Sequence, residues 1–513
     1  MARAKYNSVP RLEDYGVSPT FGFMDAHPTV NLPDYFKPWT TLATNTADLV
    51  DSGEIRERIE KMPVLDHNRL DGPRQWKAAL VLLTALANSY VWCNGEDDIP
   101  EVLPRCVAIP FAAVAAKLQV TPSLTAWGFS MINWKLKDPN GQVELDNMET
   151  IVQIRGGADE SWFMCVANQV ELDFAPALYS IVEAQKAVMD GDVERLIPEL
   201  QTIERAVRTM THTLSRMSEK CRPHVFYNVF RPFLAGWDSP AFKKKNLNGL
   251  IYEGVSDQPF SYTGGSAAQS STLPCLDAAF GVKKTESEVT LLKSFQQYMP
   301  KPHRNLITAI SEGPSIKSFV HSCRLPEAVR WFNACLSGMK DFRNGHLKVV
   351  GRYIIAMSQR GDTNNQFSQQ AEAGTGGTGF LSFLTRLRDA TIQTMLGGDR
   401  TSEVQDAVSM ATGQQDKQNK HLCNCENLGS KMRTMRSFTD IPSSSASASR
   451  LSRAPTYADR NIDNLVTDCE NLGSKMRTMR SFTGIPSSSA SASRLSRAPT
   501  YADRNIDNLV TGK

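Results

Sequence analysis

Residues 335–354, which read C-L-S-G-M-K-D-F-R-N-G-H-L-K-V-V-G-R-Y-I, predict one long amphipathic helix. The apolar residues of this stretch recur at steps of three and four and therefore share one helix face. That face carries Cys335, Met339, Phe342, His346, Val349, Val350 and Tyr353. His346 lies in the middle of the apolar stripe, whereas Lys348 and Arg352 point elsewhere.

Two interpretations of His346 are open at this point. A histidine on an apolar helix face is commonly a core residue with one satisfied hydrogen bond. The other interpretation is an imidazole aimed into an apolar cavity as an axial ligand of haem iron. Arg343, one turn earlier, would then be placed for a haem propionate. The pattern of residues alone favours the core histidine and leaves the haem ligand as the alternative.

Composition places the chain among soluble globular proteins. It has 513 residues, 41% hydrophobic and 22% charged, with a formal net charge of +3, which predicts two domains and a tail. The small net charge argues against a nucleic-acid partner. Residues 1–15 lack the apolar core of a secretory signal, and the most apolar run, residues 78–92, falls short of the roughly 20 residues of a membrane span.

The ten cysteines are mostly isolated within apolar segments, as expected for reduced thiols in the cytosol. Cys423 and Cys425 form a lone C-x-C beside His421, and no second pair completes a zinc site. We therefore expect a cytoplasmic protein that binds neither a membrane nor structural zinc.

The predicted fold is mainly α, with a small N-terminal domain (1–150) on a larger all-α domain (151–402). An irregular proline-containing segment with short helices runs to about residue 60, and residues 133–141 read as an extended arm that closes on a turn. Asp192 is a good N-cap for the helix that follows it. Helices are expected at residues 75–92, 107–118, 193–217, 225–236, 269–282, 306–320, 326–353 and 380–396.

Two further segments have unusual composition. Residues 358–377 are polar without an apolar period, which is typical of a lid or of disorder. Residues 374–379 formally match G-x-G-x-x-G but lack the β-α-β context of a dinucleotide site. The Ser-rich tail, 403–513, repeats 425–468 as 469–512 with two differences and is predicted to be disordered. A phosphorylatable or partner-binding tail is the alternative.

Four segments in this order resemble the indoleamine 2,3-dioxygenase family, haem enzymes that open the indole ring of tryptophan. They are F-Y-N-V-F-R-P-F-L-A-G-W at 226–237, G-G-S-A-A-Q-S-S at 264–271, F-R-N-G-H-L at 342–347 and G-T-G-G-T at 374–378. The resemblance covers roughly residues 15 to 400 and excludes the repeated tail. It implies a small N-terminal domain over a larger all-α domain that holds haem b.

The resemblance implies a haem side for the site. His346 would be the proximal iron ligand, and Ser266 would hydrogen-bond the haem edge. Arg343 would lie near a propionate and pair with Asp277.

The resemblance also implies a substrate side. Phe163 and Phe226 would pack against the indole, and Arg231 would bind the carboxylate with its planar, always-charged fork. The residues that would border the backbone groups of the substrate are Gly265, Ala267 and Thr375.

The chain departs from the family in the inner pocket. The usual tyrosine, cysteine and valine fall on Ala126, Phe129 and Ser130, and a serine often present there falls on Ala167. These changes leave the haem-binding residues intact and bear on substrate affinity and indole specificity.

The implied activity is addition of O2 across the C2–C3 bond of L-tryptophan or another indoleamine, giving N-formylkynurenine in the kynurenine pathway, by a monomer. One alternative is an oxygen carrier or sensor on the same scaffold; the altered segment 126–130 favours it, whereas Arg231, Phe226 and Thr375 favour the enzyme. A second alternative is a haem-free scaffold that acts through its tail.

Overall fold

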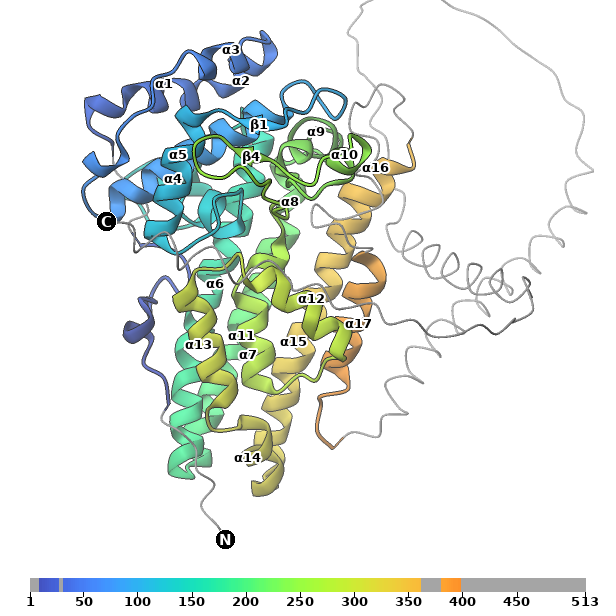
Figure 1. The fold of residues 1–513 in the computed structure, drawn as a ribbon. Coiled ribbons are helices and arrows are strands. Elements are labelled where there is room, and N and C mark those ends of the chain that lie inside the picture. The colour runs from blue at the N-terminus through green and yellow to red at the C-terminus, as the bar shows by residue number, and fades with distance from the viewer. Residues whose placement is uncertain (1–8, 27–30, 361–379, 398–513) are drawn as a thin grey trace, which may run out of the picture. The chain divides into compact units, whose positions relative to one another are not determined.

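Most of the residues that the structure, a computed structural model, describes are helical; these residues are 9–26, 31–360 and 380–397 (Figure 1). The longest helix, α6 (Gly157–Asp190), packs along α7 (Val193–Ser215). In turn α7 packs against α15 (Pro326–Val350), and α15 packs against α17 (Phe380–Ile392). The mainly α fold class is confirmed.

A second group of helices precedes this bundle. It consists of α1 (Lys37–Thr44), α2 (Thr46–Asp51), α3 (Ile55–Glu60), α4 (Gly72–Trp92) and α5 (Arg105–Leu118). Helix α4 is its centre, because it contacts the other four and is buried at every residue from Ala78 to Trp92. No helix in the described part of the chain is long and apolar enough to cross a membrane.

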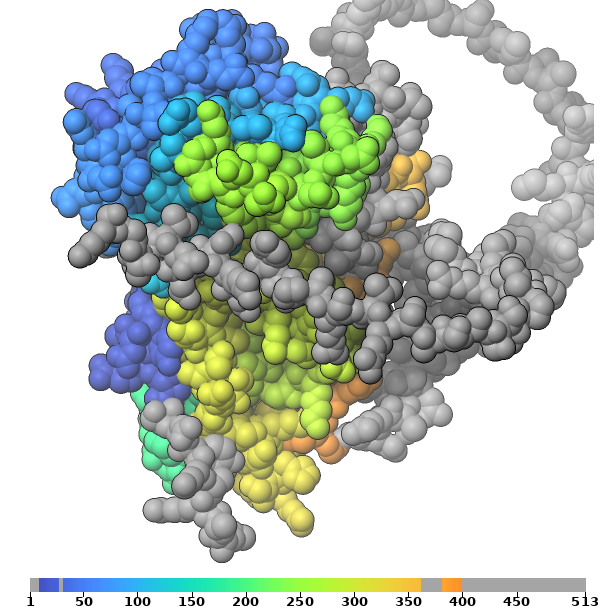
Figure 2. All heavy atoms as spheres, in the orientation of Figure 1, coloured from blue at the N-terminus to red at the C-terminus, as the bar shows by residue number. Residues whose placement is uncertain are grey.

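Strands are short and join distant parts of the sequence. Parallel pairing links β1 (Val102–Leu103) to β4 (Ile251–Tyr252), and antiparallel pairing links β2 (Lys135–Leu136) to β3 (Met148–Glu149). The β1–β4 pair brings the segment with α10 (Pro240–Lys244) and β4 against the N-terminal helices, as the light-green and blue atoms in Figure 2 show.

Shorter elements connect these parts. The 3-10 turns are η1 (Leu12–Tyr15), η2 (Asp34–Phe36), η3 (His67–Arg69), η5 (Leu145–Asn147), η7 (Arg231–Leu234) and η8 (Ala267–Gln269), and the π-helical turns are η4 (Ala126–Met131), η6 (Phe226–Phe230) and η9 (Gly351–Ile355). The remaining helices are α8 (Met217–Lys220), α9 (Pro223–Val225), α11 (Thr272–Phe280), α12 (Glu286–Gln296), α13 (Lys301–Glu312), α14 (Ile316–Cys323) and α16 (Ala356–Ser358).

The stripe that predicted the helix at 335–354 faces the interior. Lys348 and Arg352 are exposed, and His346 and Val349 are half-buried. The buried members of the stripe are Cys335, Met339, Phe342, Val350 and Tyr353. The α-helix ends at Val350, and η9 continues it as a π-helical turn.

The predicted Asp192 cap of α7 is confirmed, because the carboxylate accepts a hydrogen bond of 2.9 Å from the Arg195 N–H. The single helix predicted at 306–320 is wrong. Gly313 and Pro314 separate α13 from α14, since the residue before a proline is driven out of the helical region.

The expected start, at Gln269, of the helix after the glycine loop (264–266) is also wrong. A 3-10 turn, η8, precedes α11, which begins only at Thr272. Sequence reasoning missed α6 and α12 altogether.

The predicted boundary near residue 150 stays a prediction, because the described residues up to Met395 belong to one compact unit. The repeated tail from 403, with Cys423 and Cys425, lies outside the described residues.

Candidate active site

Three π-helical turns carry or adjoin the candidate site residues. Phe129 and Ser130 lie on η4, Phe226 begins η6, and η9 follows the helix of His346. The elements are neighbours in space, because η4 contacts η8 and α6, α6 contacts η6, and η6 contacts η9. The π-helix is rare in proteins and is found disproportionately at functional sites.

An aromatic cluster joins α6, η6 and η9. The ring centroids of Phe163 and Phe226 are 4.7 Å apart, and Phe230 lies 5.6 Å from Phe163. Tyr353 meets Phe226 edge-on at 5.7 Å. The structure thus brings together the two phenylalanines expected to hold an indole ring, and it ties them to the C-terminal extension of α15. Aromatic pairs in this distance range attract each other beyond their area burial.

Arg231 follows this cluster directly, at the first position of η7. Its side chain is only 3% exposed, and its guanidinium carbon lies 5.5 Å from the centroid of the Tyr227 ring. Burial lowers the pKa of Arg231, while Tyr227 and Glu96 act in the opposite direction. A guanidinium stays protonated at neutral pH, so Arg231 is a buried cation.

Helix α4 fixes the turn that carries Arg231. The Asn88 side-chain amide donates to the Phe233 carbonyl at 2.8 Å, and the Trp92 indole N–H donates to the Ala235 carbonyl at 3.1 Å. These bonds satisfy carbonyls at and just beyond the end of η7, where the turn itself offers no donors. Helix α4 therefore helps to position Arg231, a candidate substrate-binding residue.

The glycine loop lies directly against the same turn. Gly265 N–H donates to the Leu234 carbonyl at 2.9 Å, and Trp237 N–H donates to the Tyr262 carbonyl at 2.7 Å. A Cβ added to Gly236 would lie 2.2 Å from the Gly264 nitrogen, and one added to Gly264 would lie 2.3 Å from the Leu234 oxygen. Only glycine allows two backbones to approach so closely.

Ser266 and Ala267 leave the glycine loop into η8. The Ser266 hydroxyl oxygen accepts a hydrogen bond of 3.2 Å from the Ala268 N–H and caps the turn. Its O–H donates to no group in the described part of the chain, which leaves it available for a ligand. Ala267 is exposed and Gly265 half-buried.

The imidazole of His346 has no hydrogen-bond partner among residues 9–26, 31–360 and 380–397. Burial lowers its pKa to about 4, so the ring is neutral at physiological pH. His303, in contrast, has the environment of a core histidine with a satisfied hydrogen bond. Its Nδ1 lies 3.4 Å from the Ser271 hydroxyl, its ring packs 4.8 Å from Phe23, and it is 8% exposed.

Asp277 and Arg343 form a buried ion pair that joins α11 to α15. The Arg343 Nη2 lies 2.8 and 2.9 Å from the two carboxylate oxygens, and Lys284 Nζ lies 2.9 Å from Asp277 Oδ2. Burial acts to raise the pKa of Asp277, but the charges of Arg343 and Lys284 hold it below its usual value. Arg343 Nη1 donates to the Thr391 hydroxyl. Arg343 Nε is buried without a partner among the described residues.

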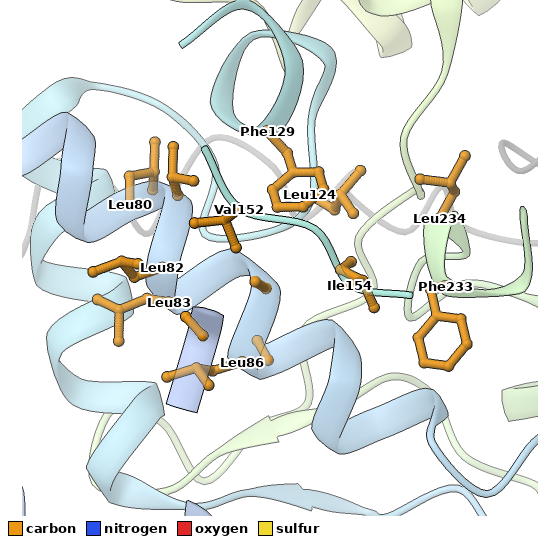
Figure 3. Packing of buried hydrophobic residues seen from close by; sticks show 14 of the residues in the cluster. Leu80, Leu82, Leu83, Leu86, Leu124, Phe129, Val152, Ile154, Phe233 and Leu234 are labelled. Atoms are coloured by element: carbon orange, nitrogen blue, oxygen red, sulfur yellow. The ribbon is translucent and has the colours of Figure 1, made fainter. Parts of the chain in front are cut away.

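The inner-pocket positions have different surroundings. Phe129 is fully buried in the same apolar cluster as Leu124 and Val152 (Figure 3). The Ser130 hydroxyl donates to Asn168 Oδ1 at 2.9 Å, and Asn168 Nδ2 donates to the Ser130 carbonyl at 3.0 Å. Ala167, half-buried, precedes this asparagine on α6. Thr375 and the glycines at 374–379 lie outside the described residues.

The family model of indoleamine 2,3-dioxygenase matches residues 11–394. The chain belongs to this family. The chain is 34% identical to human "Indoleamine 2,3-dioxygenase 2" over 392 residues, which cover 75% of this chain and 95% of the human protein. Mouse "Indoleamine 2,3-dioxygenase 1" is likewise 34% identical, with 75% and 96% covered. A protein of the abalone Haliotis madaka named "Myoglobin" is 32% identical over 382 residues, with 74% and 98% covered.

Two buried amides of this member of the indoleamine 2,3-dioxygenase family were missed by sequence reasoning. They are Asn168, which pairs with Ser130, and Gln269, which bonds to Ala126 at the start of η4. A single amide has no periodic signal, so only the motif G-G-S-A-A-Q-S-S could have pointed to Gln269.

Proposed function

We propose that the protein is a haem-dependent dioxygenase that adds both atoms of O2 across the C2–C3 bond of L-tryptophan or another indoleamine. The product would be N-formylkynurenine, which contains all atoms of both reactants. The match of the indoleamine 2,3-dioxygenase family model to residues 11–394 carries this proposal, because it spans nearly the whole described chain. The grouping of Phe163, Phe226 and Arg231 on adjoining elements supports it.

The residues of the haem side fit the group. His346 offers a neutral imidazole without a competing hydrogen bond in the described part of the chain, which is the state that binds iron. Arg343 keeps a buried N–H without a described partner, as suits a propionate neighbour. Ser266 has a hydroxyl proton free to donate. We infer that the His346 imidazole would bind the haem iron and that Arg343 and Ser266 would hold the haem edge.

The protein's own part in the reaction is binding, orientation and exclusion of water. Bound haem supplies the oxygen chemistry. Phe163 and Phe226 present apolar faces for the indole ring, and Arg231 presents a bidentate fork for the carboxylate. Because Arg231 is 3% exposed, an ion pair there forms in a dry environment, where it orients the substrate more strongly than at the surface.

A second candidate function is reversible O2 binding without turnover. The 32% identity to the Haliotis protein named "Myoglobin" favours it. The departures at Phe129, Ser130 and Ala167 point the same way, since they alter the inner pocket without touching the haem side.

The discriminating experiment mixes the haem-loaded ferrous protein with L-tryptophan and O2 and follows N-formylkynurenine by its absorbance. We expect one N-formylkynurenine for each tryptophan consumed, over many turnovers of the protein. An O2 carrier would show the oxygenated spectrum and form no product, which would overturn the proposal. A protein without a Soret band after haem supplementation would favour the tail-based alternative.

Replacing Arg231 with alanine is expected to weaken tryptophan binding by roughly 2–4 kcal/mol, because the substrate carboxylate would be left buried without its cation. Equilibrium titration of the ferric protein with tryptophan measures the loss without turnover. Arg231→Lys is the matched variant: it keeps the charge but not the planar fork, so it should recover only part of the affinity. Unchanged affinity in Arg231→Ala would place the arginine outside the substrate site.

The finer expectations belong to the same proposal: haem b, a monomer, a role in the kynurenine pathway and a cytoplasmic location. The last is supported by the burial of five of the seven cysteines in the described part of the chain.

A further inference from the structure

Gln269 joins two segments that carry candidate site residues. Its side chain is 2% exposed, and its Oε1 accepts hydrogen bonds from Ala126 N–H at 3.1 Å and Ser266 N–H at 3.4 Å. Its Nε2 donates to the Gly264 carbonyl at 3.0 Å. Two N–H groups face the oxygen and a carbonyl faces the nitrogen, so only one orientation of the amide satisfies all three.

These contacts are more than a cap of η8. A capping box requires of the Gln269 side chain only that its Oε1 accept the Ser266 N–H, and that bond is the longest of the three. The two shorter bonds reach Ala126, the first residue of η4, and Gly264 of the glycine loop. A local capping role would leave both of them unexplained.

Gln269 lies between the two sides of the site. On one side lies η4. Ser130, near the end of η4, is bonded to Asn168 of α6 by two reciprocal hydrogen bonds. On the other side, the glycine loop is bonded to Leu234, three residues after Arg231. The amide of Gln269 therefore links η4 to the glycine loop and, through the loop, to η7, which carries Arg231.

We propose that Gln269 is a positioning residue that sets the separation between η4 and the glycine loop and thereby the affinity for the substrate. It acts through Gly265 and Ser266 and touches no substrate itself. The inference rests on the proposed function, because the ligand is the tryptophan of that reaction. If a side chain of the same length but without hydrogen-bonding groups replaced Gln269, only packing would hold η4 and the glycine loop in place.

The decisive variant is Gln269→Met, which keeps the length of the side chain and removes all three hydrogen bonds. Its matched control is Gln185→Met. Gln185 is equally buried and donates to the Ile310 and Pro314 carbonyls, which are remote in sequence, but it binds none of the site segments. Both variants lose the hydrogen bonds of a buried amide, so both measure the general loss of stability. Only Gln269→Met also measures the effect on the candidate site.

For Gln269→Met we expect tryptophan to bind the ferric protein about tenfold more weakly, with KM raised alike and kcat changed less. Haem content per folded protein should stay at the wild-type level. Hydrogen exchange of the Ala126 amide should accelerate, since its acceptor is gone. Gln185→Met should leave tryptophan affinity and Ala126 exchange unchanged.

Gln269→Glu adds a readout that a purely structural role would not move. A carboxylate can still accept from Ala126 but turns a second acceptor towards the Gly264 carbonyl, whereas the protonated acid can donate to it. Burial and this carbonyl raise the pKa of the new carboxyl. Tryptophan affinity of Gln269→Glu should therefore improve as pH falls, relative to the wild type at each pH.

Equal loss of tryptophan affinity in Gln269→Met and Gln185→Met would overturn the proposal, as would unchanged affinity in Gln269→Met. If Gln269→Met does not fold, Gln269→Glu decides, and a pH profile parallel to the wild type overturns it. A wild-type protein that binds tryptophan but forms no N-formylkynurenine refutes the proposed function alone. One that binds no tryptophan refutes both.

Discussion

Replacing His346 with alanine is expected to abolish stable haem retention. The imidazole is neutral at physiological pH, because burial lowers its pKa to about 4, and it makes no hydrogen bond with the described residues. Under the proposed function this imidazole would bind the haem iron, so the variant would lack the bond that holds the iron. The ratio of Soret to protein absorbance after gel filtration measures the loss. Full haem occupancy in this variant would remove the assignment.

Two companion variants separate ligation from stability. His346→Gly supplied with free imidazole should regain a Soret band, because the small ligand can occupy the space of the missing ring. His303→Gln removes a buried histidine that bonds to Ser271, and it should lower Tm while haem per folded protein stays constant. Haem loss in His303→Gln equal to that in His346→Ala would mean that general destabilisation accounts for both.

Asp277→Asn is expected to lower the free energy of unfolding by about 3–5 kcal/mol, because it leaves buried Arg343 and Lys284 without their shared counter-charge. The side chains of Arg343 and Lys284 are 5% and 13% exposed, so water screens the two cations poorly. Urea denaturation of the apoprotein measures the effect without a contribution from haem. We also expect weaker haem binding, since α15 carries both Arg343 and His346.

The chain provides a matched control for this ion pair at its surface. Asp146 also bridges an arginine and a lysine, Arg216 at 2.7 Å and Lys220 at 3.1 Å, but its side chain is 53% exposed. Asp146→Asn should therefore cost less than about 1 kcal/mol. If the two substitutions destabilise the protein equally, burial is not what gives the Asp277 pair its importance.

Periodic apolar residues made α4, α7 and α15 predictable. Helix α6 was missed because its interior faces carry polar residues, which interrupt the apolar period. Glu171 accepts hydrogen bonds from Ser270 and Thr272, and Glu160 accepts three backbone N–H groups. The partners of Glu171 are remote in sequence and leave no local pattern, whereas those of Glu160 lie in the loop just before α6.

The site could be predicted in its residue types but not in its geometry. Phe226 and Arg231 are five residues apart, which an ideal helix would place about 140° from each other. The structure replaces the ideal helix with a π-helical turn followed by a 3-10 turn, so that angle does not apply. No residue preference announces a π-helical turn, and the family resemblance alone grouped these residues.

The contact between Gly236 and Gly264 limits how these two segments can be redesigned. Main-chain atoms alone meet there, so no side chain can be trimmed to widen the gap or enlarged to narrow it. The spacing of these two segments can therefore be changed only through the length of the loops on either side.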